Sequence, residues 1–129
     1  MREIKFRGIS IDSRYSTEEY FLKMVYGQLI NRYGDLYILM ADGIEVQVNE
    51  KTVGQYIGLQ DKNSKRIYEG DIVGTIYEED GRFIIGFDEC TASFTLSNNT
   101  LSYTFDNIYS SELEAIGNKY ENPELEGEK

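Results

Sequence analysis

Residues 52–73 read TVGQYIGLQDKNSKRIYEGDIV, and this stretch decides the fold class. Two short apolar and aromatic runs flank a polar turn, DKNSK, and glycines stand at Gly54, Gly58 and Gly70. Asp, Asn and Ser favour turns because their side chains bond to the nearby backbone, and glycine accepts a positive φ. The stretch therefore predicts a β-hairpin that leads into a further strand.

Outward from this hairpin, turn residues recur at short intervals between apolar runs. Asp-Gly pairs stand at 42–43 and 80–81, and Asp-Gly between alternating runs is a strong hairpin signal. The predicted strands are 25–30, 36–40 and 44–48 before the hairpin, and 72–77, 83–87, 91–96 and 101–105 after it. Strands of about five residues at this spacing indicate an antiparallel meander followed by a small barrel or sandwich, with little helix.

The first residues also alternate. Ile4 and Phe6 are expected on one face and Glu3, Lys5 and Arg7 on the other, with Ile9 and Ile11 resuming the apolar face after Gly8. Two segments stay open between helix and strand, 16–24 and 109–117. In the first, Ser16 and Glu19 fit a capping box, whereas Leu22, Met24 and Tyr26 alternate as in a strand.

Composition limits the function classes. The 129 residues suit one domain or two very small ones, and the net charge of −10 is uneven. Residues 1–66 hold ten Lys and Arg against nine Asp and Glu, and residues 67–129 hold three against fourteen, which gives +1 and −11. This charge disfavours nucleic acid as a partner. The chain lacks an apolar run long enough for a membrane span and an apolar signal core, which predicts a cytoplasmic protein.

Tests for reactive sites fail one by one. The chain has no histidine, which removes the commonest general base and metal ligand. Glu69 and Asp71 could share one face of a strand and bind a divalent cation, but acidic pairs of this kind are mostly solvated charges. The 61–72 segment begins like a calcium loop and then places Arg66 and Ile72 where glycine and glutamate are needed. Cys90 lies beside two acids, which disfavour its thiolate. We therefore expect no catalytic, cofactor-binding or metal site.

The motif at 52–73 closely resembles the signature of the YopX-like proteins of Gram-positive bacteriophages and prophages. Three further pieces fit the same pattern: MREIKFRG at 1–8, VYGQLI at 25–30 and EAIGNKYENPEL at 114–125. The resemblance implies a single YopX-like unit over 1–129, with a possible division into a β-meander at 1–66 and an SH3-like barrel at 67–129. It also implies a phage role in the host cytoplasm, and it implies no catalytic residue or cofactor.

The leading hypothesis is a non-enzymatic binding or assembly module that meets a protein partner or forms a homo-oligomer. The alternatives are an acidic inhibitor or nucleic-acid mimic that binds a basic host protein, a metal-assisted enzyme, and a nucleic-acid-binding barrel. The candidate partner-binding residues are the members of the central stretch that we expect to be exposed: Gln55, Tyr56, Tyr68, Glu69 and Asp71.

Overall fold

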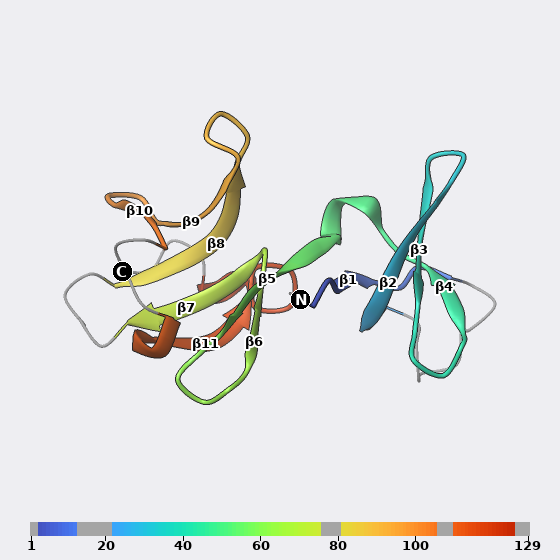
Figure 1. Ribbon diagram of the computed structural model, residues 1–129, viewed down its shortest axis with the longest axis horizontal. Coiled ribbons are helices and arrows are strands. Elements are labelled where there is room, and N and C mark those ends of the chain that lie inside the picture. The colour runs from blue at the N-terminus through green and yellow to red at the C-terminus, as the bar shows by residue number, and fades with distance from the viewer. Residues whose placement is uncertain (1–2, 13–21, 76–80, 106–109, 126–129) are drawn as a thin grey trace. The chain divides into compact units, whose positions relative to one another are not determined.

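The computed structural model describes residues 3–12, 22–75, 81–105 and 110–125 of the chain. The chain forms two compact units, Met1–Tyr56 (the N-terminal unit) and Ile57–Lys129 (the C-terminal unit). In the ranges just given, both units consist of antiparallel strands with short 3-10 turns, so the predicted mainly β class is confirmed (Figure 1). The boundary lies inside a strand, between Tyr56 and Ile57, whereas the sequence suggested a division after residue 66.

The N-terminal unit is the predicted meander. Its strands lie in the order β4-β3-β2-β1, and β1 also pairs with the start of β5. Its elements are β1 (Phe6–Ile9), β2 (Met24–Arg32), β3 (Asp35–Leu39), β4 (Glu45–Gln47), the 3-10 turn η2 (Glu50–Thr52) and β5 (Gly54–Gln60). Its core is a small cluster of buried aliphatic side chains, Val25, Ile38, Val46 and Val48.

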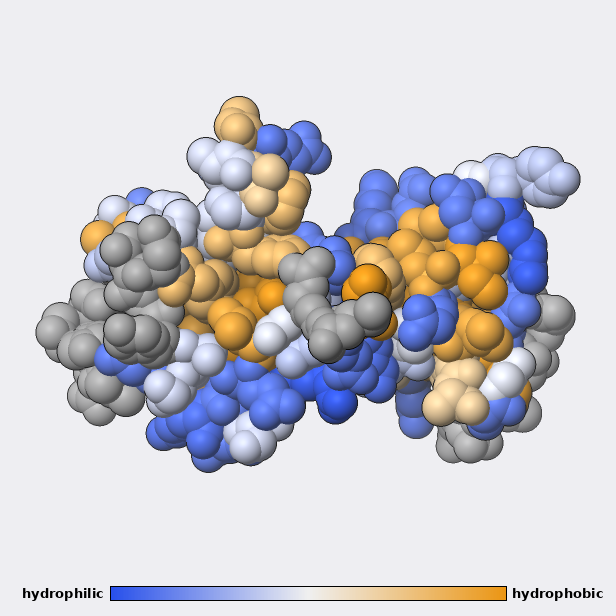
Figure 2. All heavy atoms as spheres, viewed as in Figure 1, coloured by the Kyte–Doolittle hydropathy of each residue, from blue (hydrophilic) through white to orange (hydrophobic). Residues whose placement is uncertain are grey.

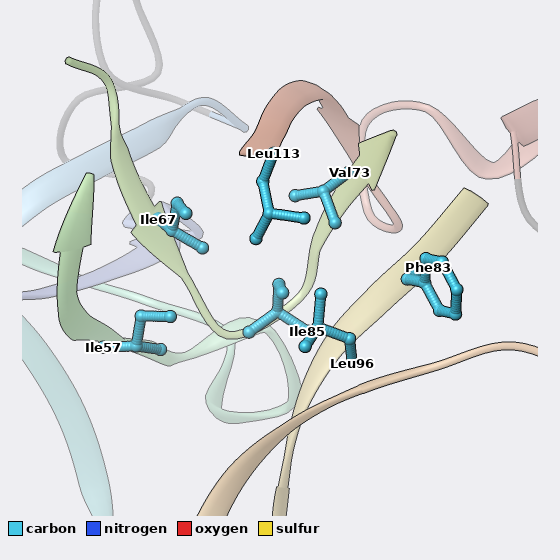
Figure 3. Close-up of a cluster of buried hydrophobic side chains, with 7 residues drawn as sticks. All are labelled: Ile57, Ile67, Val73, Phe83, Ile85, Leu96 and Leu113. Carbon is cyan, nitrogen blue, oxygen red and sulfur yellow. The ribbon is translucent and has the colours of Figure 1, made fainter. Parts of the chain in front are cut away.

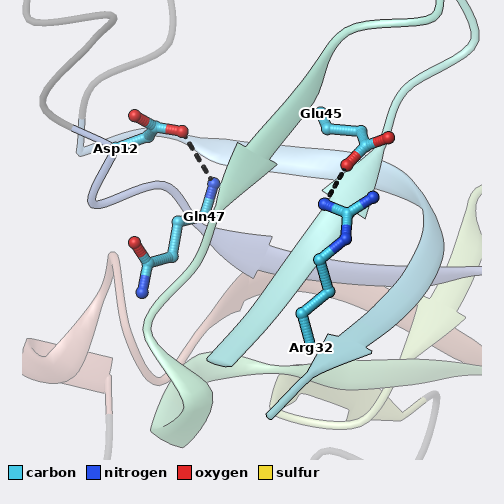
Figure 4. A network of polar contacts seen from close by, with 4 residues as sticks. All are labelled: Asp12, Arg32, Glu45 and Gln47. Carbon is cyan, nitrogen blue, oxygen red and sulfur yellow. Dashed lines mark hydrogen bonds and ion pairs between the residues drawn. The ribbon is translucent and has the colours of Figure 1, made fainter. Parts of the chain in front are cut away.

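Polar contacts cover the outer edge of β4. The backbone N–H of Gln47 donates to Oδ2 of Asp12 at 3.1 Å, and the N–H of Ile11 donates to the carbonyl of Gln47 at 2.9 Å (Figure 4). Arg32 on β2 pairs with Glu45 on β4, and this hydrogen bond raises the pKa of Arg32. Because the segment after β1 takes up these edge groups, β4 offers little free backbone to another chain.

The C-terminal unit is a five-stranded sheet in the order β10-β9-β8-β7-β11, with β6 paired to the end of β5. Its elements are β6 (Arg66–Tyr68), β7 (Asp71–Thr75), β8 (Arg82–Asp88), β9 (Ser93–Ser97), β10 (Ser102–Thr104), η4 (Ser110–Glu112), β11 (Leu113–Asn118) and η5 (Pro123–Leu125). Seven buried side chains point toward one another in its core (Figure 3): Ile57, Ile67, Val73, Phe83, Ile85, Leu96 and Leu113.

The described strands of the C-terminal unit do not close into the SH3-like barrel that the family resemblance implied. Strands β10 and β11 are the two ends of the sheet, so the sheet stays open. The core is instead covered by the β5–β6 hairpin, which supplies Ile57 and Ile67. The polar turn of that hairpin also bonds to β11, because the N–H of Lys62 donates to the carbonyl of Leu113 at 2.9 Å.

The first predicted strand has a different inner face from the expected one. Ile4 and Ile11 are 52% and 40% exposed, whereas Arg7 is only 3% exposed. Within β1, the consecutive residues Arg7 and Gly8 point to opposite faces and are both buried, so period two does not separate inside from outside there. Of the two open segments, the described part of the second, 110–117, is a 3-10 turn followed by β11, and residues 16–21 of the first lie outside the described residues.

Candidate binding groove

An apolar stripe on the β8–β9 hairpin runs from the core to the surface. On one face of β8, Phe83, Ile85 and Phe87 are 0%, 1% and 46% exposed in turn. Opposite them on β9, Leu96 pairs with Ile85 and Phe94 pairs with Phe87. Because alternate residues of a strand share a face, all five side chains belong to one surface. The cover over that surface ends before Phe87 and Phe94.

A groove of about 330 Å³ lies where this cover ends. Its lining comes from the end of β5, the start of β9 and the end of β10: Ile57, Leu59, Ser93, Phe94, Thr104 and Phe105. The rings of Phe87 and Phe94 pack edge to face beside it, with centroids 5.3 Å apart. Apolar surface is visible at the foot of the β8–β9 hairpin (Figure 2). Pockets with a mainly apolar lining and few polar groups are the usual form of binding sites.

Acidic side chains dominate the charge of strands β8 to β11, whereas the β5–β6 hairpin that supplies Leu59 also holds Lys62, Lys65 and Arg66. The sequence from Phe83 to Asn118 contains five Asp and Glu residues and no Lys or Arg. Two of the acids stand at the tip of the β8–β9 hairpin: Asp88, which pairs with the groove residue Ser93, and Glu89, which is exposed. The whole C-terminal unit has six basic and fifteen acidic residues, a net charge of −9. The groove therefore combines an apolar floor with the negative charge of its unit.

The DKNSK turn is structural and lies in the same unit. Asp61 is 6% exposed, and its Oδ1 accepts the N–H groups of Asn63 at 2.8 Å and Lys65 at 2.9 Å. Its Oδ2 accepts the N–H of Ala115 on β11 at 2.9 Å. Burial acts to raise the pKa of Asp61, but the three backbone N–H groups and the charge of Lys65 outweigh it and hold this pKa below its ordinary value. The predicted hairpin turn is confirmed.

The residues predicted to meet a partner are mostly inside. Tyr56, Tyr68 and Asp71 are 8%, 4% and 3% exposed, so the expectation that they are exposed is wrong. Asp71 turns inward because its Oδ2 accepts the N–H of Tyr68 at 2.8 Å, which closes the turn between β6 and β7. Gln55 and Glu69 are half-buried, and they belong to different units. The five residues do not form one exposed surface.

Because Asp71 is buried, it does not share an exposed face with Glu69, which the alternative of a divalent-cation site required. In the described ranges, no three His, Cys, Asp or Glu side chains are close enough to hold a metal ion. No helix in the same ranges has the length and apolar character that crossing a bilayer requires. The groove was not foreseen, because the sequence identified 83–87 and 91–96 as strands without indicating where their cover ends.

A second hollow, of about 260 Å³, lies in the N-terminal unit beside β2 and β3. It mixes charged side chains, Glu3 and Lys5, with the exposed rings and chains of Ile4 and Tyr26. Because these two charges are opposite, the hollow favours neither an acidic nor a basic ligand, so it is a weaker candidate binding site than the groove.

Comparison with known proteins agrees with this fold. The sequence model of the YopX protein family matches the chain over residues 9–125. The crystal structure of protein EF1440 from Enterococcus faecalis superposes with a TM-score of 0.54 at 20% identity, over 97% of this chain and 99% of that one. At this identity the likeness concerns the fold alone. No curated protein matches.

Proposed function

The chain belongs to the YopX protein family, and we propose that it is a non-enzymatic, phage- or prophage-encoded module that binds a protein partner in the host cytoplasm. The observation that carries the proposal is the apolar groove of the C-terminal unit, with Phe94 in its lining and Phe87 beside it. The resemblance of the central motif to phage and prophage proteins supports the setting.

Burial of the groove by a partner would be favourable. Removing a whole Phe side chain from water contributes about 1.5–3 kcal/mol, and Phe87 is 46% exposed, so covering it alone contributes about 1 kcal/mol. The partly buried Leu59 and Phe94 add to this. Aromatic side chains in a well-packed pocket are the usual centres of binding energy in protein interfaces.

The test is a capture experiment with a variant whose groove is filled. Leu59→Trp places a large ring in the groove, and Tyr33→Trp adds the same residue at a fully exposed position of the N-terminal unit. Immobilised wild type and Tyr33→Trp should retain the same proteins from a host lysate, and Leu59→Trp should lose them. Equal retention by all three baits, each checked for folding by circular dichroism, would contradict the proposal.

An acidic inhibitor or nucleic-acid mimic is the second candidate, and the net charge of −9 on the C-terminal unit favours it. Such a protein would bind a basic host protein over a broad surface, so affinity would fall steeply with salt and would not depend on the groove. Retention by Leu59→Trp that disappears at high salt would support this candidate instead.

A further inference from the structure

We infer that the groove takes a basic segment of another protein, which inserts an apolar or aromatic side chain between β5 and β9 and sets Lys or Arg beside the hairpin tip that carries Asp88 and Glu89. This inference rests on the proposed function and names the partner class. It joins two observations that the proposed function treats separately, the apolar lining and the two acidic residues at the β8–β9 hairpin tip.

The size of the groove limits what enters it. Its volume of about 330 Å³ is at the small end of the range of ligand pockets, about 300–1,000 Å³. One or two anchoring side chains fill such a space, whereas a whole amphipathic helix needs a longer trough. The lining supplies aliphatic contacts from Ile57 and Leu59 and ring contacts from Phe94 and Phe105. An aromatic or branched aliphatic anchor matches both.

The charges beside the groove select the sequence around the anchor. Asp88 pairs with the lining residue Ser93 at the end of the two strands, on the face opposite Phe87 and Phe94, and Glu89 follows it at the exposed hairpin tip. The β8–β9 hairpin, which carries these acids, holds one basic residue, Arg82, at the far end of β8. Positively charged side chains next to the anchor are therefore attracted to these two acids, and negatively charged ones are repelled by them.

A second copy of this chain fits the groove poorly. It would bring a net charge of −10 to a unit that already carries −9. Like charges brought together at an interface act against association, and two C-terminal units would both be acidic. The partner is therefore another protein with the opposite charge.

Selection from a library of random peptides tests the partner class without knowledge of the natural partner. Peptides are enriched on the wild-type protein and those that also bind Leu59→Trp are removed. We expect the remaining peptides to share an aromatic or branched aliphatic residue flanked by Lys or Arg. Enrichment of neutral or acidic peptides, or no peptide that depends on the groove, would overturn the inference.

The charges are then tested on one enriched peptide by fluorescence anisotropy. Asp88→Asn with Glu89→Gln should weaken binding about twofold to thirtyfold, the range for two exposed ion pairs. The matched control is Asp42→Asn with Glu50→Gln in the N-terminal unit. Asp42, like Asp88, accepts a backbone N–H two residues on, and Glu50, like Glu89, is exposed, so this control should leave binding unchanged.

Salt and assembly separate this inference from its rivals. Binding of the basic peptide should fall between about 0.1 M and 1 M salt, as the Debye length shortens from about 10 Å to about 3 Å. Groove-dependent binding that ignores salt and both acids would overturn the basic partner class and leave the proposed function standing. A wild-type dimer in light scattering that Leu59→Trp converts to a monomer would show that a second copy fills the groove, and would overturn the inference.

Discussion

Replacement of Asp61 by asparagine and by alanine should measure how strongly the β5–β6 turn is tied to β11. The carboxylate makes three bonds, two from Oδ1 within its own turn and one from Oδ2 to the N–H of Ala115. Asparagine keeps one acceptor oxygen and replaces the other by an NH₂ group, which cannot accept. Alanine removes both acceptors.

The expected losses follow from these contacts. A hydrogen bond to a charged group contributes about 1.5–3 kcal/mol, so Asp61→Asn should lower the free energy of unfolding by about that amount, through the bond to Ala115. Asn63 and Lys65 are exposed, so water can replace part of the two turn bonds, at about 0.5–1 kcal/mol each. Asp61→Ala should therefore lose about 2.5–5 kcal/mol.

The effect of pH gives a second test. The folded pKa of Asp61 lies below its ordinary value of 3.8, so the unfolded chain binds this proton more readily. The stabilisation is present in full above the unfolded pKa and is lost as the pH falls through the folded one. The difference in the free energy of unfolding between wild type and Asp61→Asn should therefore be constant near neutral pH and shrink below a pH of about 4.

Urea unfolding followed by circular dichroism measures the loss, and hydrogen exchange of the Ala115 amide reports the single bond. The control is Asp42→Asn, because Asp42 accepts the N–H of Ile44 at 3.0 Å within its own turn, and asparagine keeps that acceptor. Equal stability of Asp61→Asn and wild type, with unchanged exchange at Ala115, would refute the argument.

Two further predictions concern packing. A Cβ at Gly27 would collide with the carbonyl oxygen of Leu39, so Gly27→Ala should lower the free energy of unfolding by about 2 kcal/mol or more. A Cβ at Gly70, where φ is +90°, would stand 2.9 Å from Tyr120 Cε2, so Gly70→Ala should lower it by about 1–3 kcal/mol. Gly74→Ala meets nothing within 4 Å and should raise stability by up to about 1 kcal/mol; a loss equal to that of Gly70→Ala in thermal melts would contradict this. Leu96→Ala should cost about 2–5 kcal/mol and expose the amides of the C-terminal unit to hydrogen exchange more than those of the N-terminal unit. Uniform loss of protection would show that the two cores unfold together.

Local turn chemistry explains why most strands could be predicted. Asp42-Gly43 forms the turn between β3 and β4, and Gly43 has a φ of +88° that few other residues accept. The burial of carboxylates could not be predicted, because it depends on distant partners. Asp61 is recognisable as a turn residue, but its bond to Ala115 joins positions 54 residues apart. Alternation does not predict the burial of Arg7 either, because the next residue, on the opposite face of β1, is buried as well.

The groove shows a further limit of sequence patterns. Alternation places Phe83, Ile85 and Phe87 on one face of β8, but it does not predict how far a covering hairpin extends along that face. The β5–β6 hairpin covers the first two and leaves the third half exposed. A polar residue at that position would be satisfied by water, and the other face of the same hairpin is polar at Ser93 and Thr95. An aromatic pair at an uncovered strand end, beside a hollow with apolar walls, is therefore accounted for more fully by a partner that completes the cover than by the stability of the isolated chain.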